Sequence, residues 1–133
     1  MTLFCYGSLE FAEVMRAVTG RSFAHEPARL DGWVRLRFRG NAFPGLRPRA
    51  WMSTRGTLWR GIDEASALRL DRFEGDRYER RELPVRTKPG VAVTAQVYVV
   101  PDARRSELSN EPWDKARFAR ESLADFLRAL SRA

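Results

Sequence analysis

Hydrophobic and polar positions near the start of the chain indicate a strand followed by a helix. Residues 2–6 form a short apolar run, typical of a buried strand, and Gly7 interrupts it. Apolar side chains then recur at spacings of three and four residues, which place them on one helix face: Phe11, Val14, Met15 and Val18. Gly20 follows this stretch, so the helix is expected to end there.

The next segment changes to strict alternation, which predicts a half-buried strand after an Asp31-Gly32 turn. Apolar residues and arginines alternate in the order Val34, Arg35, Leu36, Arg37, Phe38 and Arg39. We expect the face formed by the three arginines to be solvated. Residues 42–50 contain proline and glycine and are predicted to form a loop, and residues 56–62 another short strand.

A second helix is predicted over residues 64–74. Asp63 is a suitable N-cap because its side chain can accept a hydrogen bond from a free amide of the first turn. Gly75 is a suitable C-terminal stop. Within the helix, Ala65 and Leu68 are expected to face inward.

The remaining pattern predicts a hairpin and a last helix. Residues 78–85 return to a strand pattern, and the Pro89-Gly90 turn joins them to residues 91–100, the most β-prone run of the chain. A polar linker follows. The last helix is expected at about residues 111–131, with Asn110 as its cap, Pro112 in its first turn and an apolar stripe of Leu123, Phe126, Leu127 and Leu130.

The order of these elements favours an α+β domain over a parallel α/β sheet, because turns rather than helices join the central strands. We therefore predict one domain over residues 1–133, with the strands curled into a small mixed β-barrel flanked by helices. A length of 133 residues suits a single core.

Composition indicates the cellular compartment of the protein and its need for a metal or cofactor. No run of about eighteen apolar residues occurs, which argues against a transmembrane helix. The first residues lack a basic segment, so a signal peptide is not expected. Cys5 and His25 are the only residues of their kinds, so neither a disulfide within the chain nor a zinc site of the usual ligands is expected. Together these features predict a cytoplasmic protein without a metal or another cofactor.

The formal charge of +7 is compatible with nucleic acid, a membrane surface or an anionic substrate. The basic residues are nearly all arginines spread along the chain, with no polybasic block. Neither interleaved exposed aromatics nor a nucleic-acid recognition motif accompanies them. We therefore expect no nucleic-acid or membrane partner.

Residues 6–9, Tyr-Gly-Ser-Leu, lie where the first strand meets the first helix. Gly7 would allow a positive φ and a close approach of the backbone to a ligand. Free N–H groups before a helix form a concave site for an anion, and the helix dipole strengthens it. An ordinary turn with Ser8 as the helix cap explains the same residues.

Glu74 stands between Phe73 and Gly75, at the predicted end of a helix. The negative pole of the helix dipole and apolar surroundings both disfavour a charged carboxyl, and so raise its pKa towards neutral. Such a group can both accept and donate a proton. A surface glutamate in a last helical turn is the alternative explanation. Residues 43–46, Phe-Pro-Gly-Leu, form a stiff segment that either lines a pocket or simply connects two strands.

Four stretches occur together in a fixed order: FCYGSL at 4–9, FPGLRP at 43–48, RLDRFEGDRYERREL at 69–83 and AQVYVV at 95–100. Their combination resembles the γ-glutamylcyclotransferase-like superfamily, in a short bacterial branch that is similar to the plant AIG2-like proteins. The resemblance covers residues 3–100 and the EPWD stretch at 111–114.

The resemblance implies a small barrel with a pocket at one end. It assigns the binding of a γ-glutamyl α-carboxylate to the backbone of Tyr6, Gly7, Ser8 and Leu9, a catalytic role to Glu74, and a place in the pocket to Tyr78. The implied reaction closes the γ-glutamyl group into 5-oxoproline and releases an amine, without a cofactor. A non-catalytic small-molecule binding module on the same fold is the alternative function.

Some residues depart from the family pattern or have no role in it. Phe43 stands where an aromatic hydroxyl is frequent in relatives. His25 is expected to be a solvated loop residue, and Cys5 a core residue rather than a nucleophile. If Glu10 points into the pocket, it would repel a substrate carboxylate. γ-Glutamyl amines, amino acids and peptides would all present the same acyl half to such a site.

Overall fold

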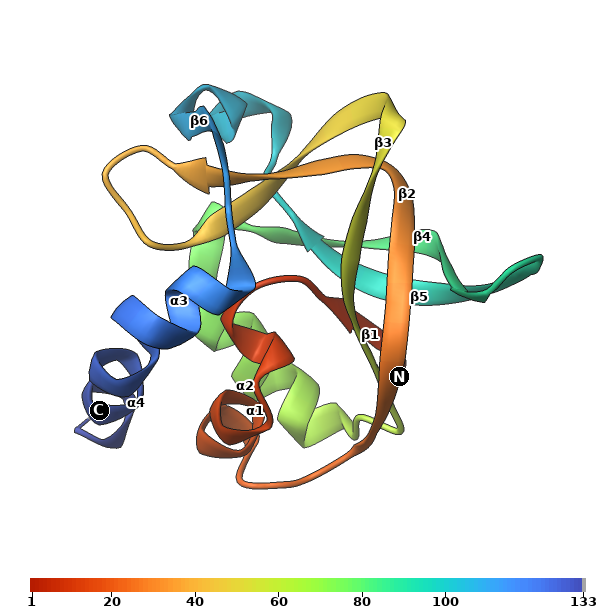
Figure 1. Cartoon of the computed structure of the whole chain (residues 1–133). Coiled ribbons are helices and arrows are strands. Elements are labelled where there is room, and N and C mark those ends of the chain that lie inside the picture. The colour runs from red at the N-terminus through yellow and green to blue at the C-terminus, as the bar shows by residue number, and fades with distance from the viewer. Residues whose placement is uncertain (133) are drawn as a thin grey trace.

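The computed structural model describes residues 1–132 as a barrel with helices gathered on one side of it (Figure 1). The strands are β1 Leu3–Cys5, β2 Ala24–Phe38, β3 Pro44–Arg60, β4 Glu79–Lys88, β5 Val91–Val99 and β6 Leu108–Pro112. The α-helices are α1 Ala12–Thr19, α2 Glu64–Glu74, α3 Lys115–Glu121 and α4 Leu123–Ser131. Short 3₁₀ helices span Ser8–Glu10, Gly75–Arg77 and Asp102–Glu107.

The strands follow the order β3-β1-β5-β4-β2-β6, and a further pairing between β2 and β3 closes the first five into a barrel. Strand β1 runs parallel to β5, whereas the other pairs are antiparallel. The predicted α+β class with a small mixed barrel is confirmed. The barrel interior is filled by apolar side chains, including Phe4, Leu30, Leu46, Leu58, Val85 and Val97.

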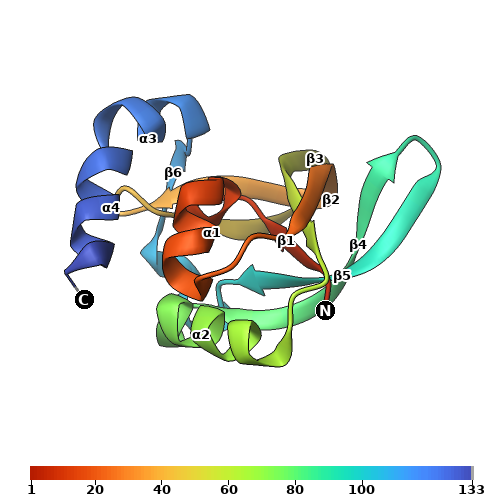
Figure 2. The ribbon, with the colours of Figure 1, turned by 90° about the horizontal axis from the view of Figure 1, so that it is seen from below.

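A second core lies between the barrel and its helices. Figure 2, which views the molecule from below, shows α1 and α2 side by side on the viewer's side of the barrel, with α3 and α4 along one flank. The buried part of this core comes from β1, α1 and α2, among other segments, and α4 adds half-buried side chains: Leu123, Phe126, Leu127 and Leu130. The ends of β1 and α2 therefore both face the junction of barrel and helices.

Two strands are longer than the sequence pattern predicts. The expected Asp31-Gly32 turn is instead a bulge inside β2, where Gly32 has a φ of 87° and the pairing with β3 shifts register. The expected loop at 42–50 is largely strand, because β3 begins at Pro44. Pro44 and Pro48 are tolerated since this half of β3 pairs with β2 alone and is an edge.

The arginine face is not uniformly solvated, so that prediction is wrong for Arg35. Its side chain is 19% exposed and lies 4.9 Å from the Trp113 ring centroid. The segment before α3 covers it, which an alternating pattern within one strand cannot reveal. Arg37 pairs with Glu111 at 3.4 Å, and Arg39 is exposed. The absence of nucleic-acid binding stays a prediction.

The C-terminal helix begins later than predicted and is divided. Residues 108–112 form β6, where Pro112 pairs with Leu36 of β2, so neither Asn110 nor Pro112 belongs to a helix. Asp114 is the N-cap of α3, accepting a hydrogen bond from the Ala116 N–H. A break at Ser122 separates α3 from α4. Strand pairing therefore overrides the local signals for a helix start.

Helices α1 and α2 begin and end close to their predicted positions. Gly20 ends α1 with a φ of 75°, and the Asp63 side chain caps α2 by accepting from the Ser66 N–H at 3.1 Å. The inward face of α2 is different, however. Leu68 is 56% exposed and Ala65 is also exposed, whereas the buried residues are Ser66, Ala67 and Leu70. No helix among residues 1–132 is both long and apolar enough to span a membrane.

Candidate active site

A pocket of about 360 Å³ opens between the end of the barrel and the helices. The end of β1 and the following loop, the β2–β3 loop, the end of α2, β5 and α4 all contribute to its wall. Every residue predicted for the site lines it, namely Tyr6, Gly7, Ser8, Leu9, Glu74 and Tyr78. The fold thus brings together two segments separated by more than sixty residues.

The loop at residues 6–9 lines this pocket and contains backbone N–H groups without a partner among residues 1–132. Within the described residues, the N–H groups of Gly7, Ser8 and Leu9 have no backbone or side-chain acceptor. The expected positive φ at Gly7 is wrong, since its φ is −128°. Glycine is required there for space, because a Cβ would lie 2.9 Å from the Pro44 Cγ.

Arg35 forms hydrogen bonds to the loop at residues 6–9 and does not itself line the pocket. Its Nη1 donates to the Tyr6 carbonyl oxygen at 2.8 Å and to Glu10 Oε2 at 3.3 Å. Glu10 also accepts from the Thr57 hydroxyl and lies 3.7 Å from the Lys115 Nζ. Glu10 is not among the lining residues, so it does not repel a substrate carboxylate from within the pocket.

Glu74 is the last residue of α2, and its side chain reaches the pocket from the helix end. Gly75 allows the chain to turn away at once, with a φ of 67° and a ψ of −157°, a conformation essentially restricted to glycine. Burial, followed by the nearby charge of Asp71, raises the pKa of Glu74 to about 8. Among residues 1–132, no group makes a hydrogen bond to its carboxyl. The carboxyl is therefore free to exchange a proton with a bound molecule.

Three tyrosine hydroxyls near Glu74 form hydrogen bonds that link segments of the pocket wall. Tyr78 donates to the Pro44 carbonyl oxygen at 2.6 Å, and Tyr6 donates to the carbonyl oxygen of Tyr98. Tyr98 in turn donates to Asp71 Oδ1 at 2.7 Å. Burial raises the pKa of each of these tyrosines, so the hydroxyls stay protonated.

Several wall residues were not singled out from the sequence. Tyr98 belongs to the β-prone run, and Phe126 to the apolar stripe of the last helix. Cys5 lines the pocket but is 4% exposed, and burial raises the pKa of its thiol, in keeping with a core residue. His25 is exposed as expected, but it lies in β2 with its ring 4.5 Å from that of Trp59.

Metal-binding residues do not cluster in the described part of the chain. Residues 1–132 contain no group of three or more histidine, cysteine, aspartate or glutamate side chains placed to hold an ion.

Residues 3–115 match the family model described as "Gamma-glutamyl cyclotransferase, AIG2-like". The chain belongs to this family. A relative in Arabidopsis thaliana, "AIG2-like protein C", is 30% identical over 128 residues, which cover 96% of this chain and 74% of the relative. The match includes both segments that meet in the pocket of this family member.

Solved structures share the fold of this γ-glutamyl cyclotransferase, AIG2-like family member. A solution structure of an Arabidopsis thaliana protein has a TM-score of 0.74 at 22% identity, covering 96% of this chain and 86% of that one. A structure named "Gamma-glutamyl cyclotransferase" has a TM-score of 0.67 at 16% identity, covering 98% and 86%. At these sequence identities, the similarity shows that the proteins share a fold.

Proposed function

We propose that the protein is a γ-glutamylcyclotransferase, which converts a γ-glutamyl amine, amino acid or peptide to 5-oxoproline and a free amine. The observation that carries this proposal is the position of Glu74. Its carboxyl, with a pKa of about 8, lines the same pocket as the free N–H groups of residues 7–9. A proton-exchanging group and an anion site are what this reaction needs.

The free N–H groups of Gly7, Ser8 and Leu9 are suited to hold the α-carboxylate of the substrate. The α-amine then attacks the γ-carbonyl carbon, forming the new C–N bond of the ring. Glu74 takes a proton from the α-ammonium and returns one to the leaving nitrogen as the old C–N bond breaks. Because both reacting groups belong to one molecule, folding the substrate back supplies much of the rate enhancement.

Tyr6 and Tyr78 are assigned to substrate binding. Each hydroxyl already donates its proton to a backbone carbonyl, at Tyr98 and Pro44 respectively. The hydroxyl oxygen can therefore act only as an acceptor towards the pocket, which suits the N–H groups of an α-ammonium. Neutral tyrosines near Glu74 also keep further negative charge away from it.

A screen of γ-glutamyl amines, amino acids and peptides with 5-oxoproline as the readout tests the proposal. Formation of 5-oxoproline from at least one class, with release of an equal amount of amine, is the expected result. Binding of such compounds without turnover would instead indicate the non-catalytic binding module.

Changes in the loop should separate backbone from side-chain contributions. Gly7→Ala and Gly7→Val are expected to raise the KM for a γ-glutamyl substrate at least about tenfold, equivalent to about 1.4 kcal/mol. Their Cβ would collide with Pro44 and displace the backbone of the loop that lines the pocket. Ser8→Ala keeps every backbone N–H and is expected to change the KM by less than about threefold.

The comparison requires that the variants remain folded, which circular dichroism and unfolding midpoints would show. A crystal grown with glutamate should place its α-carboxylate against these amides. A larger loss for Ser8→Ala than for folded Gly7→Ala would show that the Ser8 hydroxyl, rather than the backbone, holds the substrate.

A further inference from the structure

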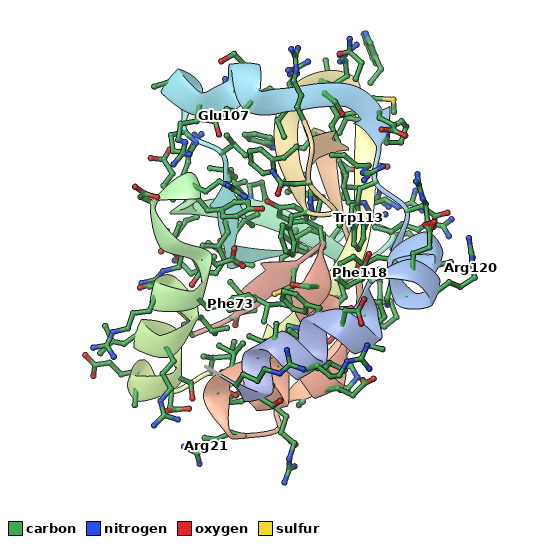
Figure 3. All side chains as sticks on the ribbon, turned by 90° about the vertical axis from the view of Figure 1, so that its left-hand side faces the viewer. Arg21, Phe73, Glu107, Trp113, Phe118 and Arg120 are labelled. Carbon is green, nitrogen blue, oxygen red and sulfur yellow. The ribbon has the colours of Figure 1, made fainter. Side chains whose placement is uncertain are left out.

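Three phenylalanine side chains from separate elements form part of the pocket wall. Phe43 comes from the β2–β3 loop, Phe73 from α2 and Phe126 from α4. The Phe126 ring centroid lies 5.6 Å from that of Phe43 and 6.0 Å from that of Phe73, and both pairs meet edge to face. Figure 3 shows Phe73 between the ribbons of α2 and α4. We call these three residues the aromatic wall.

The aromatic wall is incompletely covered by the protein. All three phenylalanines are of intermediate exposure, although they pack on one another. The Phe126 ring also contacts the ring of Phe118, with 5.9 Å between the centroids, and this contact helps to fix its position. An apolar surface that is both fixed in place and open to a pocket is suited to an apolar part of a ligand.

The pocket is larger than a γ-glutamyl group requires. Its volume of about 360 Å³ equals that of about twelve liquid waters. A γ-glutamyl group has about nine non-hydrogen atoms, each of which takes less room than a water because it is covalently bonded. Space therefore remains for a substantial part of the leaving amine.

Charge is distributed unevenly around this remaining space. Apart from Glu74, the charged residues among the described lining are Asp76 and Arg77. The Asp76 side chain is fully exposed and pairs with Arg104 at 3.3 Å, and the Arg77 guanidinium lies 5.1 Å from the Phe38 ring centroid. The aromatic wall itself carries no charge, so the part of a leaving group that contacts it is expected to be uncharged.

We propose that the aromatic wall binds an aromatic ring carried by the leaving amine of the substrate. The proposal rests on the proposed function, since Glu74 and residues 7–9 take the γ-glutamyl half in the same pocket. A ring lying against Phe43, Phe73 and Phe126 can make offset-stacked or edge-to-face contacts with them. The substrate class is thus a γ-glutamyl derivative of an arylalkyl amine or of an aromatic amino acid.

Matched pairs of substrates test this specificity. The kcat/KM for γ-glutamyl-phenethylamine is expected to exceed that for γ-glutamyl-ethylamine by about 10- to 100-fold, which is the usual effect of burying one large apolar group. γ-Glutamyl-phenylalanine and γ-glutamyl-glycine form a second pair. A higher kcat/KM for γ-glutamyl-phenethylamine than for γ-glutamyl-phenylalanine would indicate an amine as the natural leaving group, and the reverse order an amino acid. Equal kcat/KM within both pairs would overturn the proposal.

Substitutions in α4 test whether the preference for the aromatic substrate depends on the aromatic wall. Phe126→Ala is expected to lower the phenethylamine-to-ethylamine ratio at least about fivefold, and Phe126→Leu less, because leucine keeps part of the apolar surface. Leu127→Ala is the matched control, since Leu127 packs in the helix core and does not line the pocket. An unchanged ratio in folded Phe126→Ala would contradict the role of Phe126.

Absence of turnover would count against the proposed function without deciding the specificity. In that case calorimetry compares binding of the same phenethylamine and ethylamine compounds to the wild-type chain. Binding at least about tenfold tighter for the aromatic compound supports the wall as a ring site. Equal affinity, or no binding of either compound, overturns it.

Discussion

Replacing Glu74 with glutamine is expected to lower the rate of 5-oxoproline formation by at least about 100-fold, the lower end of the usual contribution of a positioned acid or base. The two side chains are nearly the same size, so contacts of α2 and the pocket wall should persist. Glutamine cannot accept the proton of the α-ammonium or return one to the leaving nitrogen. The measurement is kcat for the best substrate found in the γ-glutamyl screen.

The matched control for this substitution is Asp76→Asn. Asp76 also lines the pocket, but its side chain is fully exposed and pairs with Arg104. It is expected to change kcat by less than about threefold. Substrate affinity of Glu74→Gln should stay within a few-fold of the wild type, as measured by calorimetry. Wild-type turnover in the glutamine variant would place the proton transfer at another residue.

The same substitution is expected to stabilise the fold at neutral and alkaline pH. The Glu74 carboxyl has a pKa of about 8 in the folded chain, above its ordinary value of 4.5. The folded wild type therefore binds more protons than the unfolded chain between these two pH values, and its stability falls as pH rises through this range. Glutamine cannot ionise and does not incur this loss.

The free energy of unfolding of Glu74→Gln should thus equal that of the wild type near pH 4.5 and exceed it progressively up to about pH 8. The full difference is up to about 5 kcal/mol, and less where water reaches the carboxyl. Urea unfolding at several pH values measures it. Glu79→Gln, at an exposed glutamate of β4, is the matched control for the loss of one carboxyl. A constant difference across the pH range would show that the Glu74 carboxyl ionises normally.

Local sequence signals predicted the parts of the fold that depend on neighbouring residues. Gly20 and Gly75 end their helices, and Asp63 caps α2, because these conformations and hydrogen bonds form within one turn. The hairpin of β4 and β5 likewise follows from its Pro89-Gly90 turn and the β-prone run after it. The order of the elements favoured a small barrel, and the family resemblance placed a pocket at one end of it and added Tyr78 to the candidate residues.

Features that depend on distant pairing were not predictable in this way. Residues 108–112 carry helix-start signals, but pairing with β2 makes them a strand. Arg35 occupies a polar position in an alternating pattern, yet segments from both ends of the chain cover it. Phe126 gave the signal of a core residue, and only the packing of α4 against Phe43 and Phe73 brings it to the pocket.

One residue of the aromatic wall comes from a different part of the chain than the rest of the pocket. Glu74 and the loop at residues 6–9 lie inside the segment that matches the family model, which ends at residue 115, whereas Phe126 lies beyond it. If the proposed function and the role of the aromatic wall hold, a change in α4 is expected to alter which amine is accepted without altering Glu74 or residues 6–9. Exchanging α4 for the corresponding helix of a relative is then a route to redesigning the preference for the leaving amine.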